Sequence, residues 1–152
     1  MDFLHFKNPF LQWEQLPTFL IGEYLFYALS ILGLIHAYKN GRLHLFVWFT
    51  SFLAGTANDV FFIFLPVVDN FWQSQATIML TPRLPLYIPF VYNNFMYYPI
   101  IAAWRFRANP IIVSALAAVF GFLFYAPYDI VGAKFLWWTW HDTDAPIKHR
   151  IF

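Results

Sequence analysis

The sequence predicts an all-α membrane protein, a polytopic transmembrane helical bundle with about four spans, and three observations support this fold class. The chain of 152 residues is 61% hydrophobic and only 11% charged, whereas an ordinary soluble domain is about 25% charged. Its apolar residues form long stretches rather than a periodic stripe, and its charged residues gather at the ends of those stretches. A chain with so little polar surface cannot cover a water-soluble globule.

Four apolar stretches are long enough to cross a hydrocarbon core about 30 Å thick. We expect one transmembrane domain over residues 1–152, with spans at about 17–38, 43–67, 86–104 and 110–133. The remaining segments, 1–16, 68–85 and 134–152, are expected to be interfacial. The chain stops soon after the fourth span, so we expect it to be the front part of a larger bundle.

Short turns and small residues predict how these spans pack. The turn at residues 39–42 makes the first two spans an antiparallel hairpin. Ser51 and Gly55, like Ala117 and Gly121, stand four residues apart, a spacing that lets helix backbones approach closely.

The third span is predicted to be the least regular. Pro89 and Pro99 each lack a backbone donor. Because irregular backbone at membrane depth must be satisfied by protein or by a wet cavity, we expect this span to lie inside the bundle.

The distribution of basic residues favours both termini on the outer or lumenal side. Two short loops on the other side carry four basic residues, Lys39, Arg42, Arg105 and Arg107. An equal number is spread over longer segments on the side of the termini: Lys7, Arg83, Lys148 and Arg150.

Several classes of site are excluded by composition. The net charge is +1 without clustered Lys and Arg, so no nucleic-acid partner is expected. With no cysteine, no glycine-rich phosphate loop and no GxSxG motif, no cofactor is expected. Two His and two Asp in residues 141–149 match no tight metal motif, and a solvated interfacial loop is favoured there over a metal site.

Asp59 and Asp129 are the candidate catalytic residues. A charge at the centre of a transmembrane helix costs about 2.5 to 3.5 kcal/mol, so such residues usually face the bundle interior and find partners. A carboxyl kept neutral in a dry site could act as a general acid or base. The alternatives are a hydrogen-bonded Asp59 that ties helices together and an interfacial Asp129 next to Tyr125, on the same helix face.

Other polar residues in or beside the spans are candidate ligand-binding groups. They would offer hydrogen bonds or charge to a head group or to a buried carboxylate, together with neighbouring tyrosines such as Tyr92 and Tyr98. Packing between helices is the alternative role. These candidates are Asn58, Glu23, Asn93, Asn94, Tyr97 and Arg83.

Three blocks, GTANDVFFIFLP, ATIMLTPRLPLYIP and YDIVGAKFLWWTWHDTDAP, resemble a family of uncharacterised eukaryotic multi-pass membrane proteins that carry a domain of unknown function. The resemblance covers most of residues 55–146. It implies a membrane location rather than an activity, and it implies further spans beyond this block. A fainter similarity, in the order of the spans, is to membrane carotenoid hydratases.

Three functions remain open. The chain could hold a hydrophobic lipid or isoprenoid in a polar intramembrane pocket, with Asp59 or Asp129 as acid or base. It could be part of a proton-coupled transporter in which Glu23, Asp59 and Asp129 form a relay. It could also be a structural membrane subunit whose polar residues only join helices. The expected partners are the lipid bilayer and a hydrophobic small molecule, and the oligomeric state is open.

Overall fold

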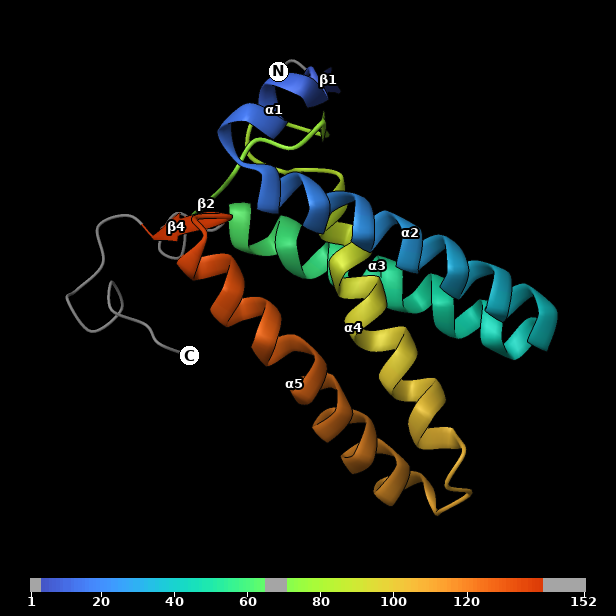
Figure 1. Ribbon diagram of the computed structural model, residues 1–152. Helices are drawn as coiled ribbons and strands as arrows, with labels where there is room; N and C mark the ends of the chain where they lie inside the picture. Colours follow the sequence, from blue (N-terminus) through green and yellow to red (C-terminus); the bar gives the residue numbers. More distant parts are fainter. Residues whose placement is uncertain (1–3, 65–70, 141–152) are drawn as a thin grey trace.

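The computed structural model describes residues 4–64 and 71–140 and is mostly helical (Figure 1). Each expected span corresponds to one long helix, and a short helix precedes them. The helices are α1 (Pro9–Gln15), α2 (Pro17–Asn40), α3 (Arg42–Phe64), α4 (Tyr87–Trp104) and α5 (Pro110–Lys134). The predicted end of the second span, residues 65–67, lies outside the described residues.

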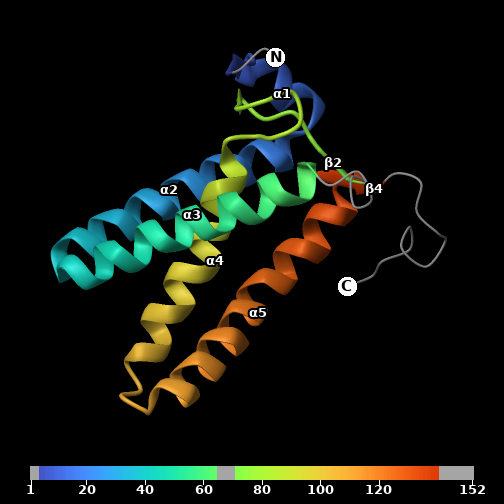
Figure 2. The same cartoon turned by 180° about the vertical axis from the view of Figure 1, so that it is seen from behind.

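The long helices form two antiparallel pairs, α2 with α3 and α4 with α5. The two pairs meet at α4. α2 and α3 make the expected hairpin, and α4 packs against α2, α3 and α5. Figures 1 and 2 show the α2–α3 hairpin and the α4–α5 pair diverging from the end where the strands lie. α5 packs mainly on α4 and is therefore the most exposed helix of the bundle.

Short strands at one end of the bundle are a departure from the all-α fold class that the sequence predicts. β1 (His5–Phe6) pairs antiparallel with β3 (Ile78–Met79), and β2 (Phe71–Gln73) pairs antiparallel with β4 (Trp138–Trp140). Backbone groups outside the helices need partners, and these segments supply them to one another. We call the described parts of these three segments, residues 4–16, 71–86 and 136–140, the cap.

Helix boundaries follow the proline, asparagine and glycine signals of the sequence. Pro17 and Pro110 stand in the first turns of α2 and α5, where a missing N–H costs no helical hydrogen bond. The side chain of Asn109 accepts a hydrogen bond from the backbone N–H of Ile112 at 3.0 Å and caps α5. Gly41 has a φ of 101°, which a residue with a Cβ rarely adopts, and separates α2 from α3.

The expected break in the third span is not observed, because α4 is one continuous helix. Pro89 lies in its first turn, where no intrahelical donor is lost. Pro99 lies inside the helix and leaves the carbonyl of Phe95 without its usual N–H partner. Gly121 of α5 lies beside that carbonyl, since a Cβ built on it would sit 3.5 Å from the Phe95 oxygen. A Cβ at this position would meet the oxygen at an ordinary van der Waals distance, so the contact of α5 with α4 here does not require glycine.

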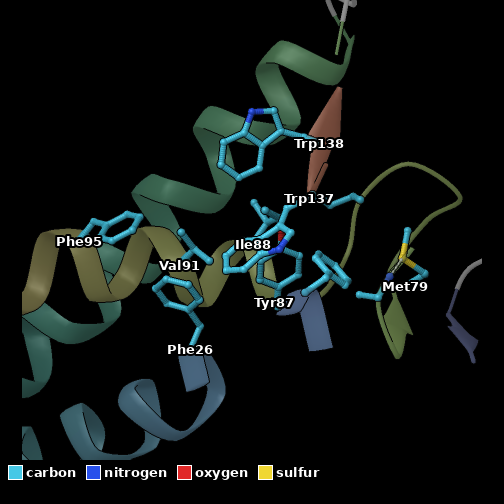
Figure 3. Packing of buried hydrophobic residues seen from close by; sticks show 11 residues of the cluster. Phe26, Met79, Tyr87, Ile88, Val91, Phe95, Trp137 and Trp138 are labelled. Atoms are coloured by element: carbon cyan, nitrogen blue, oxygen red, sulfur yellow. Dashed lines mark hydrogen bonds between the residues drawn. The ribbon is translucent and has the colours of Figure 1, made fainter. Parts of the chain in front are cut away.

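Apolar side chains form two buried clusters. The first lies where α2, α4 and the cap meet, and its rings pack mostly edge to face, as in the Phe19–Tyr87 pair at 5.3 Å (Figure 3). Its labelled members in Figure 3 are Phe26, Met79, Tyr87, Ile88, Val91, Phe95, Trp137 and Trp138. The second cluster lies nearer the opposite end: Ala37, Val47, Trp48, Tyr97 and Ile101. We call that end, with residues 39–42 and 105–109, the basic end.

Two of the long helices, α2 and α5, are long and apolar enough to cross a membrane, judged by length and composition in the described residues. Large apolar side chains are exposed along both, for example Leu25 and Ile31 on α2 and Val119 and Phe122 on α5. In α2, 39% of the most apolar stretch is buried inside the bundle, whereas in α5 none of the corresponding stretch is buried.

Candidate functional site

Glu23 lies on α2, fully buried, and binds the cap. The backbone N–H of Thr77 donates to both carboxylate oxygens at 3.0 Å, and the Tyr27 hydroxyl donates to Oε1 at 3.1 Å. The Thr77 hydroxyl lies 3.1 Å from Oε2 and 2.9 Å from Oε1 of Gln12, and donates to one of them at a time. The surroundings of Glu23 therefore supply the donors that a buried carboxylate needs.

Asp59 is a second buried acid, 3% exposed, on the face of α3 that packs against α4. Ser51, Gly55 and Asp59 are all buried at intervals of four residues on this face. Tyr92 of α4 lies over Gly55 and is an electrostatic neighbour of Asp59 and Asn58. A tyrosine of the third span therefore lies beside a buried carboxyl, while a role of either group in binding stays a prediction.

Asp129 is half-buried on α5 and accepts a hydrogen bond from the Tyr125 hydroxyl at 3.2 Å, as their spacing predicted. Tyr125 is also an electrostatic neighbour of Tyr92, so the two candidate acids contact different members of one tyrosine group. We define this group as Tyr87, Tyr92, Tyr125 and Tyr128, in which the hydroxyls of Tyr87 and Tyr128 are 3.5 Å apart. Carboxyls beside phenols in apolar surroundings can donate and accept protons.

The two adjacent asparagines of α4 bind other helices rather than the acids. The Ser30 hydroxyl donates to Oδ1 of Asn93 at 2.6 Å, and Nδ2 of Asn93 donates to the Trp48 carbonyl at 2.8 Å. The Trp48 indole N–H donates to the Ser30 carbonyl at 3.2 Å, which closes a network across α2, α3 and α4. Asn94 donates to the Phe26 carbonyl at 3.0 Å, while its buried Oδ1 has no hydrogen-bond partner among the described residues.

Tyr97 lies near the basic end, away from the acids. Its hydroxyl is 2.8 Å from Nδ1 of His36, and the neighbouring Tyr98 donates to the Leu29 carbonyl at 2.6 Å. A pocket of about 580 Å³ opens beside these side chains, lined by His36, Tyr98, Arg105 and apolar side chains of α4 and α5. The carboxylates take no part in its lining.

Arg83 lies in the cap, between β3 and α4, and is half-buried. Its backbone N–H donates to Oγ1 of Thr81 at 3.3 Å. Among the described residues no group of three His, Cys, Asp or Glu side chains could hold a metal ion. The segment 141–149, considered above for metal binding, lies outside the described residues.

The candidate residues therefore do not form one site. Glu23 binds the cap, Asn93 and Asn94 join helices, Tyr97 faces the basic end, and Asp59 and Asp129 contact the tyrosine group. The sequence analysis missed Ser30, Thr77 and His36 as hydrogen-bond partners, and it did not connect Arg105 with a pocket. Ser30 could have been found by its place in a row of small residues on one face of α2, with Gly33 and Ala37, whereas Thr77 has no local signal.

Comparison with known proteins bears on the resemblance described above. The chain matches no curated protein and no solved structure. It does match one family over almost its whole length, as the three blocks suggested. The chain belongs to the family described as Domain of unknown function (DUF7802), whose match covers residues 2–152.

Proposed function

We propose that the chain is a multi-pass integral membrane protein in which α2, α3, α4 and α5 each cross the bilayer and form one structural unit. The network of Ser30, Trp48 and Asn93 carries this proposal, because it joins three helices and satisfies its own donors and acceptors. In hydrocarbon no water replaces a lost partner, so a closed network holds helices in register.

The two ends of the bundle support four spans. The shortest long helix, α4, has 18 residues, or about 27 Å at 1.5 Å per residue, close to the hydrocarbon thickness. The cap gathers all three interfacial segments at one end, and the basic end holds both remaining loops. An even number of crossings requires this arrangement, and large apolar side chains are exposed between the two ends.

Single introduced cysteines test this topology without background, because the chain has no cysteine. We expect Asn40→Cys and Ala108→Cys to react with a membrane-impermeant maleimide from one side, and Gln75→Cys from the other. Leu25→Cys and Val119→Cys are exposed on the bundle but should be protected by lipid until detergent is added. Labelling of positions 40 and 108 from opposite sides would rule out four spans.

A second candidate function is the binding of a hydrophobic ligand, a lipid or isoprenoid, beside Asp59. One observation favours it: Glu23 receives several hydrogen bonds, whereas the polar neighbour of the Asp59 carboxyl in the described chain is the Tyr92 phenol. A buried carboxyl with acceptor capacity left is suited to proton transfer. A proton relay is the weaker alternative: Tyr87 is an electrostatic neighbour of both Glu23 and Asp59, but the hydrogen bonds of Glu23 go to Thr77 and Tyr27, and that of Asp129 comes from Tyr125.

A further inference from the structure

No acidic side chain is among the described residues that line the pocket at the basic end. The pocket is lined by residues from three parts of the fold, among them His36 from α2, Arg105 just after α4 and Phe120 from α5. No Asp or Glu occurs in residues 24–58 or 70–128, which include both loops of this end and all the lining residues. The positive charge of Arg105 in this pocket is therefore not neutralised by an acidic side chain from those segments.

Arg105 is the fixed positive charge of the pocket. It is exposed, and within residues 4–64 and 71–140 its side chain forms no hydrogen bond or ion pair. A guanidinium offers five N–H donors in a planar fork that matches the oxygens of a phosphate. The neighbouring His36 uses Nδ1 for Tyr97, which leaves Nε2 as its second polar atom.

The other walls of the pocket are apolar. Ile101, Ala102, Phe106 and Phe120 line it, and Tyr98 keeps its hydroxyl on the Leu29 carbonyl and so presents its ring. A volume of about 580 Å³ lies within the range of small-molecule sites, about 300–1,000 Å³. The pocket therefore combines one charged edge with an apolar floor, which is the chemistry of an amphiphile.

We propose that this pocket binds an anionic phospholipid, with its phosphate on Arg105 and the start of its acyl chains against Ala102, Phe106 and Phe120. The proposal rests on the membrane topology proposed above, which places Arg105 at the level of the lipid head groups. The four basic residues in two short loops favour the cytoplasmic side for this end, and anionic lipids are enriched in the cytoplasmic leaflet. The rest of each acyl chain lies along exposed apolar side chains of α5, such as Val119.

Native mass spectrometry of the purified full chain tests the proposal with two lipids that share their acyl chains, phosphatidylglycerol and phosphatidylcholine. We expect the wild type to retain phosphatidylglycerol about tenfold more tightly, a factor that corresponds to about 1.4 kcal/mol. Arg105→Gln should abolish this preference. Arg107→Gln is the matched control, because it removes an exposed charge two residues away that does not line the pocket.

A pocket-filling variant separates the cavity from its charge. Ala102→Phe leaves every cation in place but fills the floor, and it should lower retention of the anionic lipid. Equal losses in Arg105→Gln and Arg107→Gln, or full retention in Ala102→Phe, would overturn the proposal in favour of diffuse surface charge. Competition by inorganic phosphate at the lipid's own concentration would show a phosphate site rather than a lipid site. If cysteine labelling supports four spans but the protein shows no preference for the anionic lipid, the lipid site is wrong and the proposed topology still stands.

Discussion

The backbone N–H of Thr77 donates to both oxygens of the buried Glu23 carboxylate, at 3.0 Å each, although the two residues are 54 positions apart. This contact fastens the cap to the first long helix. The same segment carries β3, which pairs with β1 at the N-terminal end of the chain. Loss of this single acceptor would therefore free backbone groups in two parts of the cap.

Glu23→Ala is expected to loosen the cap without unfolding the helices. A buried donor left unsatisfied costs about 1–3 kcal/mol, so amide exchange at Thr77 and its neighbours should accelerate by about 10- to 100-fold. Glu23→Gln keeps one oxygen acceptor and should have a smaller effect. Hydrogen exchange measured by mass spectrometry checks both, with the exposed Glu14→Ala as control. Unchanged exchange in Glu23→Ala would show that the cap is held by other contacts.

Asn93→Leu should destabilise the junction of α2, α3 and α4. The change removes the acceptor of Ser30 and the donor to the Trp48 carbonyl, and interhelical bonds of this kind contribute about 0.6 kcal/mol on average and up to about 1.7. We expect a loss of about 1–2 kcal/mol in the free energy of unfolding in detergent. Thr50→Ala is the control, because its hydroxyl bonds carbonyls of its own helix. A larger loss in the control would argue against the network.

The sequence was sufficient to predict the long helices, because their ends carry strong local signals. Pro17, Gly41 and the Asn109–Pro110 pair stop or start helices by their own backbone chemistry. The strand pairs of the cap were not predictable in the same way. β1 and β3 are two residues each and lie about 70 positions apart, so neither shows a periodic pattern.

The candidate site was predictable as a set of buried polar residues but not as a set of pairs. The apolar context of Asp59 and Asn93 indicated burial, and both are buried. Glu23 is buried as well, although its place near the start of a span also allowed it to snorkel to the nearer surface. Their partners depend on how each helix is rotated and where helices cross, which a single sequence does not specify. In the sequence Arg105 served only as one of the basic loop residues that indicate orientation in the membrane. The search for a site began from acids inside the spans, so it did not lead to a cation at the end of a helix.

Gly55→Ala should weaken the contact between α3 and α4. A Cβ at this position would overlap Cβ of Tyr92 and approach its Cα within 3.4 Å, so backbone must move. Overpacking of this kind costs about 1–3 kcal/mol. Gly121→Ala is the matched control, since its Cβ would meet the Phe95 oxygen at an ordinary distance of 3.5 Å. Thermal unfolding of both variants in one detergent checks this, and equal midpoints would contradict the close approach at Gly55.

The last prediction concerns the role of Asp59. Asp59→Asn keeps the side-chain volume and one oxygen acceptor beside the neighbouring Tyr92 phenol, so expression and thermal stability should remain close to wild type. Asn cannot donate or accept a proton as a carboxyl does, so a ligand-binding or catalytic role requires the variant to lose activity or retained ligand. Mass spectrometry of lipid extracts from purified wild type and variant measures the ligand.

Asp59→Ala distinguishes chemistry from packing at this position. It removes the carboxyl and leaves a gap beside Tyr92, so it should lower stability as well as ligand retention. If Asp59→Asn and Asp59→Ala lose stability equally and neither changes the retained lipids, Asp59 only joins α3 to α4. A stable Asp59→Asn protein that has lost its ligand would instead show that the ligand needs the charge or the exchangeable proton of the carboxyl, because Asn keeps its volume and one oxygen acceptor but has neither.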